Sequence, residues 1–482
     1  MDGVKVLFLA AEATPFTKVG GLADVAGALP KALHSLGVDV RVIIPRYGTM
    51  QGGGYEFHRL GSLAVPIGSG EEHALLLETN VAGVPVYLIW NDQYFSNRER
   101  VYGFNDDPQR FTFFSKGVLA TLKMLDWKPD VVHANDWHTA AVPAWLSVYG
   151  RAQVHYRDIA TLFTIHNLAY QGICGRLILT FAQMDKLPHL TGEVPGQVNW
   201  MAQGIAHADL VNTVSPTYAR EIVAGEAGMG LSGLLKERQD RLFGILSGID
   251  VDLWNPATDD ALTQTYDVAS LKMRAVNKNA FQRETRLSTN QDTPLLAMVT
   301  RLDDTKGLDL VIPALEDLLQ ERDIQFALLG TGDEVYETKF RDVQARFPNN
   351  VRAFIKFDER LARRIYGSAD VILVPSRAEP SSIALMSAMH YGVVPVVHAT
   401  GGLADVVVDA DAQPDRGTGF AFTDYTASAL ADGIRRALRA YENKARWLGL
   451  QCRAMERDFS WDASARAYVD LYRRAVALHR TQ

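Results

Sequence analysis

The sequence predicts an α/β protein made of two doubly wound, parallel-sheet domains. Three observations support this fold class. The chain has 482 residues, which is too long for a single hydrophobic core. Short apolar runs alternate with amphipathic helical segments, as in parallel sheets with helical crossovers. This alternation breaks once, near residues 246–260, where Gly, Asp and Pro cluster, and then resumes as a second series.

The first series opens with a βαβ unit. Residues 4–11 predict a strand buried on both faces, 21–36 predict a helix with apolar residues at helical spacing, and 38–45 predict the next strand. Further strands are expected at 84–90, 130–134, 160–165 and 209–214. We therefore expect a first domain at residues 1–248, against which a C-terminal helix at 463–482 packs.

The second series contains five more apolar runs. Strands are expected at 294–300, 324–330, 351–357, 370–376 and 393–399, with helices between them, for example at 307–322 and 361–368. This pattern predicts a second domain of the same class at residues 249–462.

The composition narrows the possible partners and the compartment. The net charge is −7 and no basic tract stands out, so a nucleic-acid partner is not expected. The two cysteines lie far apart and show no metal-ligand spacing, which fits a reducing compartment. No apolar run reaches the roughly 18 residues of a membrane span. We expect a soluble, cytoplasmic protein.

The hexapeptide GGLADV occurs twice, at residues 20–25 and 401–406. Both copies follow predicted strands, where ligands bind in open α/β sheets. A glycine pair at the start of a helix lets backbone N–H groups approach an anion, and Lys18 adds a positive charge before the first copy. Glycine pairs also serve as simple tight turns, and the motif alone supports the two interpretations about equally.

Two further segments place charged residues after predicted strands. Arg301 and Lys306 precede a predicted helix and suit a diphosphate, although solvated pairing with neighbouring aspartates explains them as well. Glu379 precedes Pro380, a residue favoured at the first helical position, so the following N–H groups form a second anion site. Glu379 could cap that helix or hydrogen bond to sugar hydroxyls.

The segments 133–146 and 164–172 concentrate polar and aromatic side chains at loop starts. They contain His133, Asp136, Trp137, His138, His166, Asn167 and Tyr170. This mixture suits a carbohydrate, which needs hydrogen bonds and ring faces. Zinc is the competing ligand, but no HExxH or paired Cys supports it. A serine hydrolase is disfavoured because no G-x-S-x-G follows a strand.

Ten motifs together resemble those of bacterial glycogen synthases and plant starch synthases (glycosyltransferase family 5), over nearly the whole chain. Each motif alone is weak, and the combination is specific. They are KVGGLADVAGALP, VYGFNDDPQRF, HANDWHTA, TIHNLAYQG, NTVSPTYAREI, SGIDVDLWNPATD, TRLDDTKGLDL, PSRAEP, TGGLADVV and DFSWDASA.

The resemblance implies a fold and a reaction. The fold would be two Rossmann-like domains facing each other across a cleft, the arrangement called GT-B. The enzyme would transfer glucose from ADP-glucose to the nonreducing-end 4-hydroxyl of an α-1,4-glucan such as glycogen, with retention of configuration and with neither metal nor cofactor. The first domain would bind the acceptor and the second the nucleotide-sugar.

The resemblance also assigns roles to residues. Arg301 and Lys306 would neutralise the diphosphate, and Glu379 would hold glucose hydroxyls. The backbone carbonyl of His166 would stabilise positive charge at the anomeric carbon. Lys18 and the amides of Gly20 and Gly21 would face the donor. The remaining substrate-binding candidates are Asp24, Tyr102, Asp136, Asn167, Phe357, Ser381, Ser382, Ile383, Thr400, Gly401, Gly402 and Leu403.

The chain departs from the family pattern at several of these positions. The loop that usually reads F-E-P-C-G-L is A-E-P-S-S-I at 378–383, and Ser232, Ser247 and Phe357 replace an acidic residue, Asn and Tyr. Two alternatives follow: a divergent glycosyltransferase with another donor or acceptor, and a weakly active or regulatory glucan-binding paralogue. Retention of Lys18, Arg301, Lys306 and Glu379 argues against a protein that only binds.

Overall fold

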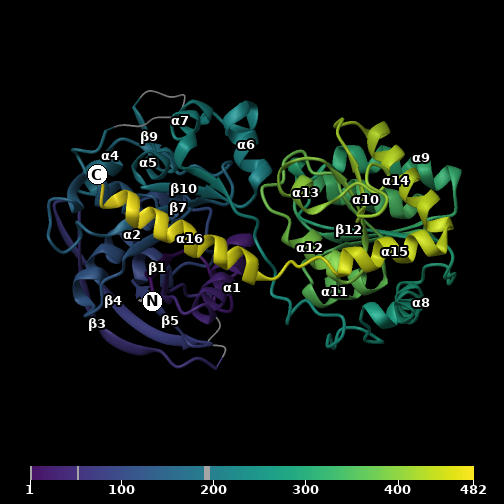
Figure 1. The fold of residues 1–482 in the computed structure, drawn as a ribbon, viewed down its shortest axis with the longest axis horizontal. Coiled ribbons are helices and arrows are strands. Elements are labelled where there is room, and N and C mark those ends of the chain that lie inside the picture. Colours follow the sequence, from purple (N-terminus) through teal and green to yellow (C-terminus); the bar gives the residue numbers. More distant parts are fainter. Residues whose placement is uncertain (1–2, 51–53, 189–195, 482) are drawn as a thin grey trace. The chain divides into compact units, whose positions relative to one another are not determined.

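The computed structural model describes residues 3–50, 54–188 and 196–481. The chain divides into two compact units, one comprising Met1–Gly248 with Trp461–Gln482 and the other Ile249–Ser460 (Figure 1). Each contains a sheet whose central strands are parallel, so the predicted α/β class with two doubly wound units is confirmed. That the two units face each other across a cleft stays a prediction.

The first unit is built on a sheet with the strand order β11-β10-β7-β6-β1-β2-β5-β4-β3. The chain runs outward from β1 on one side through β2 and β5, and on the other side through β6, β7 and β10, so the strand order reverses between β1 and β6. The parallel strands are β1 (Lys5–Leu9), β2 (Asp39–Pro45), β5 (Val84–Trp90), β6 (Val131–Asn135), β7 (Ala160–Ile165), β10 (Leu210–Thr213) and β11 (Leu242–Gly244).

One edge of this sheet differs from the expectation of a purely parallel sheet. The strands β3 (His58–Ile67) and β4 (Gly70–Val81) form an antiparallel hairpin beside β5. Part of β3 alternates between exposed and buried residues, because one of its faces meets water. A search for continuous apolar runs therefore missed this hairpin.

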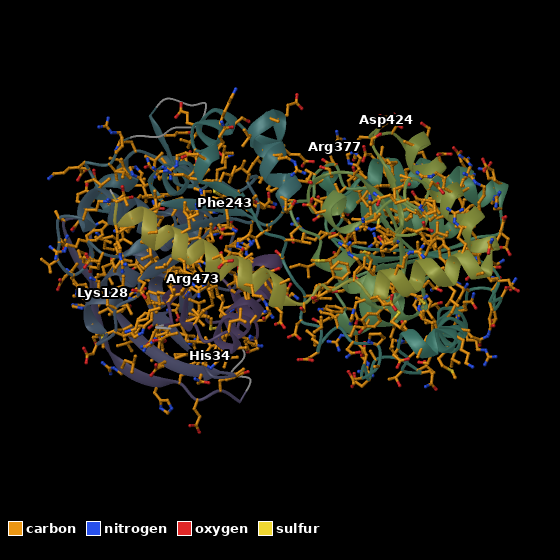
Figure 2. All side chains as sticks on the ribbon, in the orientation of Figure 1. His34, Lys128, Phe243, Arg377, Asp424 and Arg473 are labelled. Carbon is orange, nitrogen blue, oxygen red and sulfur yellow. The ribbon has the colours of Figure 1, made fainter. Side chains whose placement is uncertain are left out.

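The C-terminal helix α16 (Trp461–His479) packs on the first unit against α1, β6 and β7 (Figure 1). Its inward face carries Tyr472, whose hydroxyl lies 2.8 Å from Nδ1 of His133, while Arg473 points outward (Figure 2). His133 is fully buried in β6, and its Nε2 contacts Thr164 Oγ1 at 2.6 Å. The expectation that His133 belongs to a ligand site is therefore wrong, because Nδ1 contacts α16 and Nε2 contacts β7 within the sheet.

Seven further α-helices and a small hairpin lie among the described residues of the first unit. The start of α6 follows a local sequence signal, because Ser215 accepts a hydrogen bond from Tyr218 N and Pro216 occupies the first helical position. The elements are α1 (Gly21–Ser35), α2 (Asp107–Met124), α3 (Ala141–Trp145), α4 (Leu177–Phe181), α5 (Trp200–His207), α6 (Pro216–Ala224) and α7 (Ser232–Glu237), with β8 (Ile173–Gly175) paired to β9 (Gln197–Asn199).

The second unit contains an all-parallel sheet in the order β14-β13-β12-β15-β16-β17, which reverses between β12 and β15. Its strands are β12 (Leu295–Val299), β13 (Gln325–Gly330), β14 (Val351–Ile355), β15 (Val371–Val374), β16 (Val394–His398) and β17 (Phe420–Phe422). Its helices are α8 (Arg274–Thr285), α9 (Leu308–Glu321), α10 (Glu334–Arg346), α11 (Glu359–Ser368), α12 (Ile383–His390), α13 (Gly401–Val406), α14 (Ala427–Glu442) and α15 (Lys444–Met455).

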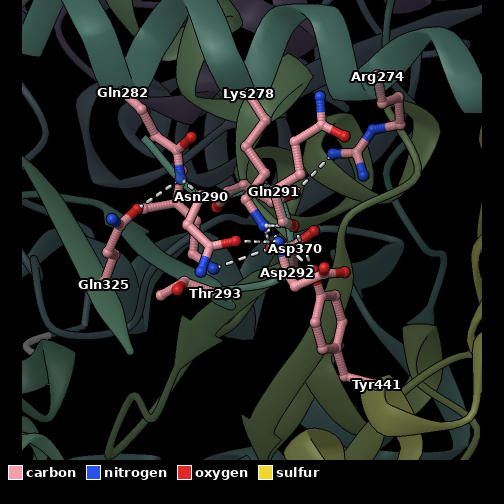
Figure 3. Close-up of polar contacts among 12 residues, drawn as sticks. Arg274, Lys278, Gln282, Asn290, Gln291, Asp292, Thr293, Gln325, Asp370 and Tyr441 are labelled. Atoms are coloured by element: carbon pink, nitrogen blue, oxygen red, sulfur yellow. Dashed lines mark hydrogen bonds and ion pairs between the residues drawn. The ribbon is translucent and has the colours of Figure 1, made fainter. Parts of the chain in front are cut away.

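A buried ion pair ties α8 to this second sheet (Figure 3). Lys278 Nζ lies 2.6 Å from Asp370 Oδ2, and the two side chains are 5% and 10% exposed. The same carboxylate oxygen accepts from the amide of Leu295, the first residue of β12, at 2.8 Å. Lys278 also donates to the Gln291 carbonyl and the Tyr441 hydroxyl, so the buried ammonium keeps its hydrogen bonds.

None of the helices in the described parts of the chain combines the length and the apolar character that a membrane crossing needs.

We predict that His479 stabilises the first unit in a pH-dependent way. Nδ1 lies 3.0 Å from Asp209 Oδ2 and Nε2 lies 2.8 Å from the Arg157 carbonyl, so the ring is held as a doubly protonated imidazolium. The hydrogen bond to Asp209 raises the pKa of His479 above its ordinary 6.5. Its contribution to stability is therefore full below about pH 6.5 and is lost as pH rises through the raised pKa.

Urea unfolding of the wild type and His479→Asn over this pH range tests the prediction. The difference in unfolding free energy should be largest below about pH 6.5 and should shrink at higher pH. The control is His34→Asn at an exposed position of α1 (Figure 2). A difference for His479→Asn that does not change with pH would contradict the prediction.

Candidate functional site

The predicted site residues follow strands on both sides of the point where each strand order reverses. In the first unit, the loops after β1, β6 and β7 carry Lys18, Asp136 and His166. In the second unit, the loops after β12 and β15 carry Lys306 and Glu379. Ligands of doubly wound sheets bind beside the carboxyl ends of the strands at this reversal. Each unit therefore presents its own candidate cluster.

Glu379 and Lys306 form the centre of the cluster on the second unit. Lys306 Nζ lies 2.8 Å from Glu379 Oε2, and each side chain is 15% exposed. The hydroxyl of Ser376, which is itself buried, donates to the same Oε2 at 2.8 Å. Two donors thus hold the carboxylate in one orientation at the end of β15.

Arg301 lies on the same β12 loop and is much more accessible. Its side chain is 60% exposed, and Nη2 lies 3.4 Å from Asp303 Oδ2. The loop ends at Gly307, whose φ of +71° places it in the left-handed region, and a Cβ there would come within 2.1 Å of the Pro375 carbonyl. Glycine is thus required for the β12 and β15 loops to lie against each other.

The second GGLADV copy packs against the Glu379 loop. Gly402 N donates to the Glu379 carbonyl oxygen at 2.9 Å. Gly401 has φ +46°, and a Cβ on it would lie 2.2 Å from that oxygen. Thr400 and Leu403, at the start of α13, are buried. The copy therefore supports the backbone that carries Glu379, and the predicted contact of its residues with a nucleotide-sugar stays a prediction.

The helix after Glu379 begins later than the sequence suggested. Pro380 was expected at the first helical position, but α12 begins at Ile383 and Ser382 is the residue that precedes it. The backbone at 380–382 is needed to pack against Gly402, whose absent Cβ would lie 3.1 Å from the Pro380 carbonyl. Among the predicted amides, that of Ile383 belongs to the first helical turn, while Ser381 and Ser382 precede it.

Two further aromatic residues of the second unit lie after β14 and after β17. Phe357 follows β14 and is 80% exposed, which is the exposure needed to stack on a planar ligand. Arg377 lies over the Tyr425 ring at 4.2 Å, and the Tyr425 hydroxyl donates to Asp309 at 2.8 Å. The backbone N–H of Arg377 also donates to the Thr305 carbonyl, which joins the β15 loop to the β12 loop.

On the first unit, Asp136 organises the loop that carries His166. Its Oδ1 accepts from His166 N at 2.8 Å, and the amide of Asn167 also donates to its carboxylate. Burial raises the pKa of Asp136 to about 7. Its backbone has φ +55° and ψ 178°, a conformation that costs a non-glycine residue free energy. This strained geometry is typical of functional loops.

The His166 ring is neutral and held in one tautomer. Asn135 Nδ2 donates to the Leu9 carbonyl at 2.8 Å, so Asn135 Oδ1 is the acceptor that faces His166 Nε2 at 2.8 Å. Nε2 therefore carries the proton, and Nδ1 keeps its lone pair. Burial lowers the pKa of His166 to about 3, which keeps the ring uncharged at neutral pH.

The amides of the first GGLADV copy are hydrogen bonded within the chain. Gly20 N donates to the side chain of Glu12 at 3.1 Å, as does the amide of Val19. The expected contact of the Gly20 and Gly21 amides with a donor stays a prediction. Gly21 starts α1, and Lys18 Nζ lies 2.7 Å from Asp24 Oδ1.

Tyr102 connects the first copy to the Asp136 loop. Its hydroxyl donates to Glu12, and its ring lies 4.9 Å from the His138 ring. His138 in turn contacts Trp137, with ring centroids 4.3 Å apart. Burial lowers the pKa of His138 to about 3, so it too is neutral. The predicted residues Lys18, Asp24, Tyr102, Asp136 and His166 thus belong to one part of the first unit.

Two other expected residues lie at the margin of this cluster. Asn167 Oδ1 accepts from Ala169 N at 2.9 Å, which closes a turn, and Tyr170 is 56% exposed. Sequence reasoning missed Glu12, Asn135 and Ser376. Their side chains form hydrogen bonds with Gly20, His166 and Glu379, respectively. The signal for Glu12 was present, because it is an acidic residue directly after a buried strand.

Within residues 3–50, 54–188 and 196–481, no three or more His, Cys, Asp or Glu side chains are grouped as metal ligands would be.

Comparison with known families and proteins covers both units. The model of the starch synthase catalytic domain matches residues 5–237, and the model of glycosyl transferases group 1 matches residues 281–448. The glycogen synthase of Geotalea daltonii is 43% identical over 98% of this chain and 99% of its own length. That of Moorella thermoacetica is 44% identical over 99% of this chain and 98% of its own.

Two solved structures show the same fold. The catalytic domain of starch synthase IV from Arabidopsis thaliana, bound to ADP and acarbose, has a TM-score of 0.92 at 32% identity and covers 98% of this chain and 100% of its own. This match identifies the two-domain architecture as GT-B. The sucrose-phosphate synthase of Thermosynechococcus elongatus, with a TM-score of 0.62 and 18% identity over 98% of this chain and 99% of its own, shares the fold.

We predict that Gly401→Ala destabilises the second unit and displaces the Glu379 loop. The alanine would pay about 1–2 kcal/mol for the left-handed conformation, and its Cβ would overlap the Glu379 carbonyl. The melting temperature should fall by at least about 2–4 °C. Gly233→Ala is the control, since its Cβ meets no described atom within 4 Å. Equal melting temperatures for the two variants would contradict the packing described for Gly401.

Proposed function

Because the chain belongs to the glycogen and starch synthase family of glycosyltransferases, we propose that it elongates an α-1,4-glucan with glucose from ADP-glucose and retains the anomeric configuration. The proposed acceptor is the nonreducing-end 4-hydroxyl of glycogen. The reaction needs no metal or cofactor, and the proposed location is the cytoplasm.

The observation that carries the proposal is the pairing of Lys306 with Glu379 beside Arg301. A carboxylate that only capped a helix would need no ammonium group, and a lysine that only solubilised the surface would not be 15% exposed, as Lys306 is. Together, the two cations suit a diphosphate and the carboxylate suits sugar hydroxyls. A nucleotide-sugar presents both groups side by side.

The chemistry follows from the charges that develop. As the bond between the anomeric carbon and the phosphate oxygen breaks, negative charge grows on ADP, and Arg301 and Lys306 would stabilise it. Lys306 would then be shared between the phosphate and Glu379, whose Ser376 contact keeps the carboxylate in place. Both of these contacts fall on Oε2, so Oε1 is the oxygen that we assign to the glucose hydroxyls.

The first unit would stabilise the sugar as it becomes positively charged. Asp136 holds the His166 backbone through the N–H of His166, which would aim its carbonyl at the anomeric carbon. The neutral His166 ring avoids adding a positive charge where positive charge develops. The acceptor 4-hydroxyl would attack from the face that the diphosphate leaves, and would pass its proton to the departing phosphate. Lys18 would act on the same donor.

ADP-glucose is preferred as the donor on two grounds. The related starch synthase IV was solved with ADP, and the exposed Phe357 offers a ring face to a base. A second candidate is a divergent enzyme with another nucleotide-sugar, which Ser381 and Ser382 favour because they change the Glu379 loop from the family pattern.

Purified protein given glycogen and labelled ADP-glucose or UDP-glucose separates these functions. We expect incorporation from ADP-glucose at a kcat/KM at least about tenfold above that for UDP-glucose, a difference of about 1.4 kcal/mol. Preference for UDP-glucose would favour the divergent enzyme. Binding of glycogen with no incorporation from either donor would contradict the ADP-glucose-dependent synthase and favour a glucan-binding paralogue.

We predict that Glu379→Gln lowers kcat by about 10²- to 10³-fold, the loss typical of removing one preorganised electrostatic group. Glutamine keeps the shape but removes the charge that pairs with Lys306. Steady-state kinetics with ADP-glucose and glycogen measure the loss, while calorimetry should show ADP binding retained. Glu321→Gln, which removes an exposed pair with Arg435, is the control. Activity of Glu379→Gln within threefold of the wild type would remove Glu379 from its proposed role.

A further inference from the structure

Glu12 is a buried carboxylate in the loop after β1, and neither the motifs nor the proposed reaction gives it a role. Its side chain is 3% exposed. It accepts hydrogen bonds from the amides of Val19 and Gly20 and from the Tyr102 hydroxyl. In the described part of the chain, no lysine or arginine forms an ion pair with it. Three hydrogen-bond donors therefore replace the water around its charge.

Burying such a carboxylate costs free energy, and this cost is reflected in a raised pKa. Burial raises the pKa of Glu12, and the N–H groups of Val19 and Gly20 and the Tyr102 hydroxyl oppose that rise. The start of α1 adds a favourable dipole, because Gly20 is the residue that precedes its first turn. A polar group that costs free energy to bury needs a compensating role, and the loop that it contacts indicates one.

The loop at residues 18–20 has an inward side and an outward side. Its amides at 19 and 20 point inward to Glu12, whereas the side chains of Lys18 and Val19 are 34% and 57% exposed. An ideal Cβ on Gly20 would lie 3.4 Å from Glu12 Oε1, so the carboxylate is in direct contact with this backbone. Without Glu12, these two amides would lose their acceptor and the loop would lose its anchor.

We propose that Glu12 is a positioning residue, which sets the conformation of the Lys18–Gly21 backbone so that Lys18 reaches the donor. This inference rests on the proposed function, because the donor contact of Lys18 is part of that function. Tyr102 lies in the loop before α2, and its hydroxyl belongs to the same hydrogen-bond network. Two predicted site residues, Lys18 and Tyr102, therefore depend on the carboxylate of Glu12.

The first test measures the loop itself and requires no activity. Glu12→Gln keeps the size of the side chain but replaces one acceptor oxygen with an NH₂ group that cannot accept an N–H. Hydrogen exchange of the full chain should become at least tenfold faster at the amides of residues 19 and 20. Asp209→Asn is the matched control, because Asp209 is a buried carboxylate that accepts the Thr161 amide elsewhere in the unit. Unchanged exchange at 19 and 20 in Glu12→Gln would overturn the proposal.

The second test asks whether Glu12 acts through Lys18. Glu12→Gln should lower kcat/KM for the donor by about 10- to 100-fold, as expected for charge-assisted hydrogen bonds. In a Lys18→Ala background the same change should cost less than threefold, because the loop then carries no ammonium group to position. Asp209→Asn should lower the melting temperature and leave kcat/KM unchanged. Equal losses from Glu12→Gln in both backgrounds would overturn the proposal.

The two tests separate this inference from the proposed function. Wild-type protein that transfers no glucose from either donor would contradict the proposed function, and loop exchange would still decide whether Glu12 holds the loop. Normal transfer by the wild type, with exchange at 19 and 20 unaffected by Glu12→Gln, would overturn the inference alone.

Discussion

Buried carboxylates that accept backbone N–H groups hold the loops on which the first candidate cluster depends. Glu12 holds the loop before α1 and Asp136 holds the loop after β7, while in the second unit Asp370 holds the start of β12, at the strand end away from Lys306 and Glu379. At the end of a parallel strand the backbone leaves the sheet ladder, and its amides need new acceptors. A short acidic side chain supplies two oxygens at such a place, and its burial is tolerated because each oxygen gains donors.

Carboxylates at strand ends serve different chemistry in the two units. In the second unit, Glu379 pairs with the cation Lys306, so the cluster combines both charges at one strand end. In the first unit, Asp136 contacts backbone amides and the neighbouring His166 ring is uncharged. A diphosphate needs the cations of the second cluster, whereas a sugar that develops positive charge is better served by the carbonyl and neutral ring of the first.

Much of this arrangement could be predicted from the chain because parallel strands leave a strong local signal. Runs such as 324–330 are buried on both faces, so they are apolar throughout and easy to recognise. The loops with Arg301, Lys306 and Glu379 follow directly from where those runs end. The hairpin of β3 and β4 was missed because a strand at a sheet edge faces water on one side and its pattern weakens.

Local patterns failed where contacts between distant segments decided the outcome. The predicted helix start at Pro380 was wrong because Gly402 packs on residues 380–382. His133 has the residue type of a ligand-binding site, yet its ring forms a hydrogen bond with Tyr472, which lies 339 positions away. Element type and candidate charges can thus be predicted from the chain, because they depend on neighbours in sequence. The partner of each polar group emerges only on folding, because it depends on neighbours in space.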